Sequence, residues 1–130
     1  MASVQQIKLP NILRDTIVSL VRREGPDLTA RQLAALLICY LEDGPHTVRG
    51  LAARLQVAKP AITRALDRLE EFQLARRLQD PRDRRSIVVA RTPAGESFME
   101  QLRGLLDDAA RSAASGGRAA GRPADERLAG

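Results

Sequence analysis

The chain has 130 residues, enough for one domain with a modest apolar core, and its single cysteine excludes an internal disulfide and a cysteine-rich zinc site. Only 2% of the residues are aromatic, so neither an aromatic-lined pocket nor a base-stacking surface is expected. Residues 46–91 carry eleven Lys or Arg against five Asp or Glu, a net charge of +6. Residues 1–45 sum to zero (five against five) and residues 92–130 to −1 (five against six). A basic excess confined to the middle of the chain is typical of a polyanion-binding surface.

The N-terminal segment, "MASVQQIKLPNIL", lacks the basic end and continuous apolar run of a signal peptide, and no stretch is long enough to span a membrane. We therefore expect a cytoplasmic protein without a membrane partner. The sequence has no glycine-rich phosphate loop, no nucleophile motif and only one histidine, so no enzyme activity, metal or other cofactor is predicted.

Helical spacing predicts two helices in the first third of the chain. The first follows Pro10, with Asn11 as its N-cap, and its apolar positions are Leu13, Ile17, Leu20 and Val21. The second starts at Thr29, with Gln32 placed for a capping box. Its apolar stripe is Leu33, Leu36, Leu37 and Tyr40, and "EDGP" ends it.

A third helix is predicted over 47–55, and only "QVA" separates it from a fourth over 59–72. The period then changes, and "ARRLQ" (75–79) and "SIVVA" (86–90) are predicted as two short strands joined by a charged turn.

Thr92-Pro93 predicts the start of a fifth helix by supplying an N-cap and an N1 proline. That helix is expected to bury Phe98, Leu102, Leu105 and Leu106 and to end near Arg111. The remaining Ala/Gly/Arg-rich segment has few apolar side chains to bury. The predicted organisation is a folded region over 1–112 followed by a disordered tail over 113–130.

Two helices joined by a three-residue turn and followed by a hairpin indicate a winged helix-turn-helix. The predicted fold class is mainly α with a small two-stranded β-hairpin, flanked by N- and C-terminal helices. In this arrangement the helix 59–72 enters the major groove of double-stranded DNA with its outward residues facing the bases. Arg64 can bind guanine O6 and N7, Thr63 offers a hydroxyl and a methyl, and Lys59 suits a phosphate. The candidate DNA-binding residues on this helix are Lys59, Pro60, Thr63, Arg64 and Arg68. The alternative is a solvated face on which Arg64 or Arg68 pairs with Asp67 or Glu71.

The charged turn over 80–85 is predicted to enter the minor groove as the wing. Arg82, Arg84 and Arg85 supply its cations, because a minor-groove contact favours a group that is always charged. Asp80 and Asp83 are expected to support the wing by bidentate pairing with particular arginines. The alternative is a polar turn whose charges only pair with each other, although exposed pairs contribute little to stability.

The segment 28–106 resembles the winged-helix core of the MarR family of bacterial transcriptional regulators. The most specific parts of the resemblance are "KPAITRALDRLE" and "DPRDRRSIVVARTPAG". It implies a nucleoid-associated homodimer that binds a palindromic operator, usually as a repressor. It places Lys59, Pro60, Thr63 and Arg64 on the recognition helix and Arg84 at the wing tip, with Arg82 as second candidate. Asp80, Asp83 and Arg85 would brace the wing.

The sequence departs from the family pattern at several positions. Ala58 replaces a small hydroxyl residue, so the recognition helix lacks a side-chain N-cap, and Gln56 and Gln73 stand where glycines are frequent. Family members dimerise through long terminal helices that also enclose an effector pocket. Here those helices are predicted to be short. We still expect them to form the dimer, but we do not expect a full-sized pocket for a small-molecule effector.

Three further interpretations remain open. An architectural DNA-binding protein of low specificity would share the basic surface, and a winged-helix protein-interaction module would expose an apolar patch on helix 59–72 or the wing. Cys39 could be a redox sensor, but "ALLICYL" places it in an apolar segment without an adjacent cation, so we expect a core residue.

Overall fold

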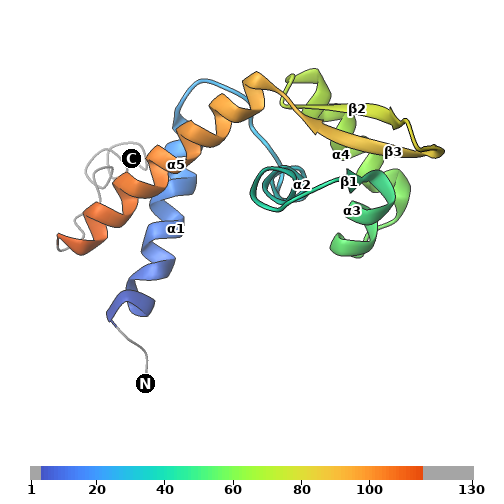
Figure 1. Cartoon of the computed structure of the whole chain (residues 1–130). Helices are drawn as coiled ribbons and strands as arrows, with labels where there is room; N and C mark the ends of the chain where they lie inside the picture. The colour runs from blue at the N-terminus through green and yellow to red at the C-terminus, as the bar shows by residue number, and fades with distance from the viewer. Residues whose placement is uncertain (1–3, 116–130) are drawn as a thin grey trace, which may run out of the picture. The chain divides into compact units, whose positions relative to one another are not determined.

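The computed structural model describes the backbone of residues 4–115 and the side chains of residues 8–115 (Figure 1). Its elements are α1 (Val4–Arg22), α2 (Ala30–Leu41), β1 (His46–Thr47), α3 (Val48–Leu55), α4 (Lys59–Glu71), β2 (Ala75–Asp80), β3 (Asp83–Arg91) and α5 (Pro93–Ala114). They fall into two compact units, one made of residues 26–100 and one of residues 1–25 with 101–130. No helix within the described range is long and apolar enough to cross a membrane.

The predicted fold class, mainly α with a small sheet, is confirmed, but the sheet has three strands rather than two. The order is β1-β3-β2, and both pairings are antiparallel. In β1, His46 pairs with Val89 and Thr47 with Val88. A two-residue strand has no detectable period of its own, and it exists because β3 is available to pair with it.

The core of the first unit lies where α2, α3 and α4 meet. Its largest fully buried side chains are Leu36, Leu51, Ile62, Leu66 and Leu69. The predicted capping box is present, because the Thr29 hydroxyl accepts from the Gln32 backbone N–H and the Gln32 side chain accepts from that of Thr29. Figure 1 shows α3 and α4 beside the β2–β3 hairpin.

Tyr40 connects α2 to the beginning of α5. Its hydroxyl donates to the Leu74 carbonyl at 2.6 Å and accepts from the Thr92 backbone N–H at 3.0 Å. The Thr92 hydroxyl donates to the Gln73 carbonyl and accepts from the Gly95 N–H, which confirms its predicted role as N-cap. The direction in which α5 starts is therefore determined by the side chains of Tyr40 and Thr92, which bind backbone groups on both sides of the hairpin.

The terminal helices are longer than predicted. α1 starts at Val4 rather than after Pro10, because an internal proline removes only one backbone hydrogen bond and the helix continues through it. α5 continues to Ala114, past the predicted end near Arg111, with Ala113 buried. The predicted tail boundary at 112/113 thus falls inside α5, and the predicted tail over 116–130 lies outside the described residues.

The unit formed by the terminal segments buries only part of its apolar surface. Thr16, Leu102, Ala109 and Ala113 are buried. In contrast, α1 exposes apolar residues spaced four apart, and Leu106, predicted to be buried, is 42% exposed. The exposed α1 positions are Leu9, Leu13, Ile17, Val18 and Val21.

Candidate nucleic-acid interface

α4 is amphipathic, with a strictly apolar inner face. Ile62, Ala65, Leu66 and Leu69 are buried, which leaves the polar positions of the helix on its outer side. The tight turn before α4 depends on Gln56, whose φ of 57° is left-handed, and Gln73 after the helix has a φ of 62°. The strain expected where family members often carry glycine is therefore present at both positions. As predicted, Ala58 is an N-cap without a side-chain hydrogen bond.

The predicted contact residues of α4 occupy its outer side. Lys59, Pro60 and Arg64 are exposed, and Thr63 is half-buried. Arg68 is exposed but paired, since its guanidinium lies 3.0 Å from the Glu71 carboxylate and 4.7 Å from the centre of the Phe72 ring. The alternative of a paired face therefore holds for Arg68 and not for Arg64.

The wing has a different tip from the one predicted. β2 ends at Asp80 and β3 begins at Asp83, so Pro81 and Arg82 form the turn itself. Arg84 lies in β3, where the register is irregular between Gln79, paired with Ile87, and Asp80, paired with Asp83. β3 therefore carries three residues, 84–86, without partners in β2, and this bulge presents Arg84 and Arg85.

The two wing aspartates bind backbone groups, not guanidinium groups. Asp80 Oδ1 accepts from the Arg82 N–H at 2.9 Å, and Asp83 Oδ1 accepts from the Arg85 N–H at 3.0 Å. The Gln79 amide donates to the Arg84 carbonyl at 2.9 Å, a contact between the two strands that the sequence does not predict. The expected bidentate pairs are thus wrong: short polar side chains close local turns more readily than they reach a neighbouring guanidinium.

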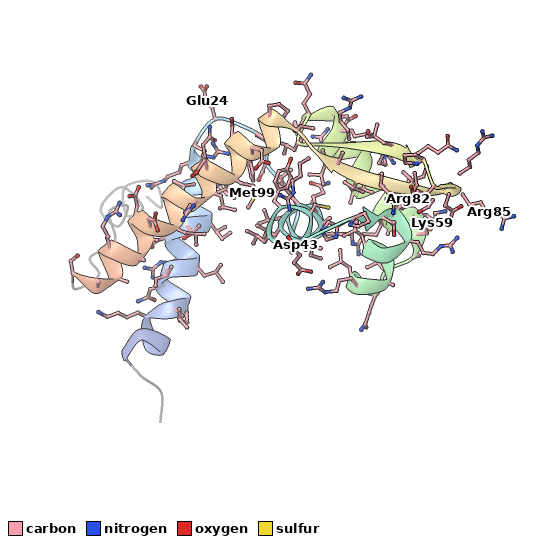
Figure 2. The ribbon with its side chains drawn as sticks, in the orientation of Figure 1. Glu24, Asp43, Lys59, Arg82, Arg85 and Met99 are labelled. Carbon is pink, nitrogen blue, oxygen red and sulfur yellow. The ribbon has the colours of Figure 1, made fainter. Side chains whose placement is uncertain are left out.

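Two groups of cationic side chains can be distinguished in the first unit. Arg54, Arg77 and Arg91 bind carboxylates or carbonyls of the fold. Within the described residues, by contrast, no hydrogen bond or ion pair engages the cationic groups of Lys59, Arg64, Arg82, Arg84 and Arg85. Figure 2 shows Lys59, Arg82 and Arg85 at the same end of this unit, around the wing and the adjacent helices.

A groove of about 430 Å³ lies between α3, the start of α4 and the wing. Cationic side chains from all three elements line it, namely Arg49, Lys59, Arg77 and Arg85, together with the hydroxyls of Thr47, Thr63 and Ser86. Arg49 was not among the predicted contact residues. Its position in the first turn of α3 becomes relevant only when the fold brings α3 next to the wing.

Cys39 is a free cysteine of α2 and is buried. Arg91, distant in sequence, donates to the Cys39 carbonyl, so the expectation of no nearby cation is wrong. Burial nevertheless outweighs that charge and raises the pKa of the thiol to about 11. The described residues contain no cluster of His, Cys, Asp and Glu that could hold a metal ion.

Comparison with known proteins agrees with this architecture. The MarR family model matches residues 28–87. The crystal structure of MarR has a TM-score of 0.61 with this fold, at 31% identity over 93% of this chain and 91% of that one. The chain belongs to the MarR family.

Two further relatives extend the comparison. The uncharacterized HTH-type transcriptional regulator YsmB of Bacillus subtilis is 26% identical over 92 residues, which cover 66% of this chain and 62% of YsmB. The chain thus spans about three fifths of the length of that curated relative. MepR of S. aureus, in a crystal structure with DNA, has a TM-score of 0.62 at 21% identity over 78% of each chain, a likeness that shows the shared fold.

Proposed function

We propose that this MarR-family protein is a homodimeric, sequence-specific transcriptional regulator, acting as a repressor, that binds double-stranded DNA. The observation that carries the proposal is the division of its cations. The arginines that stabilise the fold are paired, whereas Arg64 on the outer side of α4 and the wing arginines Arg82, Arg84 and Arg85 have no hydrogen-bond or ion-pair partner for their guanidinium groups within the described residues, which leaves them able to neutralise phosphates or bind bases. Another protein of this fold, MepR, has been solved with DNA, which supports the same use of the fold.

Each free side chain has a distinct proposed role. Arg64 binds a guanine edge in the major groove, Thr63 contacts a neighbouring base, and Lys59 at the helix start binds a phosphate beside Pro60. Arg82 and Arg84 enter the minor groove, and Arg85 contacts its edge. Asp80 and Asp83 support the wing through backbone hydrogen bonds. Arg68 is already paired with Glu71, so its proposed role is restricted to binding a phosphate at the edge of the site.

The homodimer is supported by the exposed apolar face of α1. Leu9, Leu13, Ile17 and Val21 follow one another at intervals of four residues, so they lie along one side of the helix. In the proposed homodimer, a second copy of the chain packs against this face. Two recognition helices related by a two-fold axis then bind half-sites about 10 bp apart.

A protein-interaction module is less well supported. The exposed large apolar residues of the hairpin are Leu78 and Ile87, and the register places them on opposite faces, because Leu78 pairs with Val88 and Ile87 with Gln79. They form no continuous patch, and the outer side of α4 has no exposed large apolar side chain in the described structure.

The test is a titration of the protein against genomic DNA fragments at two salt concentrations. We expect selective binding that weakens steeply as salt rises, since each neutralised phosphate releases a counterion. Arg64→Ala should reduce discrimination among fragments, and Arg84→Ala should weaken binding to all of them. Arg54→Ala is the control, because it removes an equal charge that Glu42 already holds. Equal affinity for every fragment would favour an architectural protein, and absence of binding would overturn the proposal.

A further inference from the structure

Arg77 connects the hairpin that carries the wing to the recognition helix α4. Its side chain makes more hydrogen bonds between the hairpin and α4 than any other side chain of the described residues. It lies in β2, and its Nε donates to Glu70 Oε1 at 2.9 Å while its backbone N–H donates to Glu70 Oε2 at 2.8 Å. Its Nη2 donates to both Glu70 and Asp67 of α4. A weaker contact of 3.5 Å joins Nη1 to the carbonyl of Thr63. One guanidinium thus spans two turns of α4.

The contacts between Arg77 and Glu70 are better protected from solvent than an ordinary surface ion pair. The side chains of Arg77 and Glu70 are 22% and 33% exposed. The hydrogen bond from the Arg77 backbone, followed by its side-chain bonds and charge, lowers the pKa of Glu70 against the effect of burial. The pKa of Arg77 is raised: burial acts to lower it, but hydrogen bonds to Glu70 and Asp67 and their charges prevail. Both partners therefore remain charged at neutral pH.

We propose that Arg77 is a positioning residue that determines the distance between the wing and α4, so that the two elements reach adjacent grooves of one DNA site together. The inference rests on the proposed DNA-binding function. This role also explains why a helix that faces a polyanion carries the carboxylates of Asp67 and Glu70, which would otherwise repel it. Arg77 holds both carboxylates toward the hairpin and offsets their charge.

The competing interpretation is that Arg77 binds DNA itself, because it also lines the groove beside Lys59 and Arg85. Its hydrogen bonds argue against this. Each of the three guanidinium nitrogens already has an acceptor on α4, whereas the guanidinium groups of Arg64 and Arg85 have none within the described residues.

Glu70→Gln distinguishes positioning from direct contact by the sign of its effect. Removing a negative charge near DNA strengthens binding when only charge matters. If Glu70 holds the wing through Arg77, the same change weakens binding, by about tenfold. Glu71→Gln is the matched control: Glu71 lies next in α4 but pairs with Arg68 at the surface, so its loss should leave affinity unchanged or raise it.

A double-mutant cycle then separates wing positioning from a general loss of stability. Arg84→Ala removes a wing contact, so in that background Glu70→Gln should cost less than about twofold. All variants are compared at a temperature where circular dichroism shows each to be folded. Tighter or unchanged binding by Glu70→Gln, or losses that multiply in the double variant, would overturn the inference. Failure of the wild-type protein to bind DNA would instead overturn the proposed function, and the wild-type titration alone reveals it.

Discussion

The Tyr40 hydroxyl occupies the space that a Cβ atom on residue 95 would need: a Cβ built on Gly95 lies 1.7 Å from that oxygen and 2.4 Å from the Leu74 carbonyl oxygen. Gly95 is therefore required for α2 to approach the first turn of α5. We expect Gly95→Ala to lower the free energy of unfolding by about 3 kcal/mol in urea denaturation.

The control for this substitution lies in the same helix. A Cβ on Gly104 would meet no atom within 4 Å, so Gly104→Ala should raise the free energy of unfolding by about 0.5–1 kcal/mol through helix propensity alone. Similar effects of the two substitutions would show that the contact between Tyr40 and Gly95 does not restrict the fold.

The left-handed residues that flank α4 offer a second prediction. Gln56 and Gln73 have φ values of 57° and 62°, a conformation that glycine adopts without steric cost. Gln56→Gly and Gln73→Gly should each raise the free energy of unfolding by about 1 kcal/mol. Gln56→Ala and Gln73→Ala, which remove the same side chain without relieving the backbone, should give no gain. Thermal and urea unfolding of the four variants provides the measurement.

The missing N-cap of α4 offers a third prediction. Ala58 has the extended backbone of an N-cap (φ −66°, ψ 147°) but no side-chain acceptor for the free N–H groups of the first turn. Ala58→Ser should therefore stabilise the protein by about 1 kcal/mol in thermal unfolding. Ala53→Ser, at an exposed position inside α3, should be neutral or slightly destabilising. A gain at Ala53 equal to that at Ala58 would contradict the capping explanation.

The exposed stripe of α1 predicts how the oligomeric state responds to a charge. Leu13 is 62% exposed in the single chain, and in the proposed dimer a second copy covers it. Leu13→Glu should shift the protein toward monomer in sedimentation equilibrium, because an unpaired carboxylate in an apolar interface is strongly unfavourable. Leu41→Glu is the control, since Leu41 is 70% exposed but lies at the end of α2 in the other unit. Dimerisation that withstands Leu13→Glu would place the interface elsewhere.

Features determined by neighbouring residues could be predicted from the sequence, and features determined by distant residues could not. The capping box of Thr29 with Gln32 and the N-cap of Thr92 depend on spacings of three residues, so local chemistry is sufficient. The strand β1 exists only through its pairing with β3.

The same distinction applies to the candidate interface. The cationic residues of α4 and of the charged turn could be predicted from composition and helical spacing, but Arg49 of α3 and Arg77 of β2 could not. The register that makes Arg82 the turn residue, and the choice by Asp80 and Asp83 of backbone over guanidinium partners, depend on how the hairpin closes. The contact of Arg77 with α4 joins residues that only the folded hairpin brings together.

Cys39 provides the last prediction, which concerns alkaline pH. Burial raises the pKa of its thiol from an ordinary 9.0 to about 11, so the folded protein retains a proton that the unfolded chain loses first. Its contribution to stability is complete below pH 9.0 and is lost as pH rises through the folded pKa near 11. Over that window the wild-type free energy of unfolding should fall more steeply than that of Cys39→Ala, by at most about 1.4 kcal/mol per pH unit. Native protein at pH 8 should also resist a thiol-alkylating reagent that labels the urea-unfolded chain, and rapid native labelling would contradict the buried, neutral thiol.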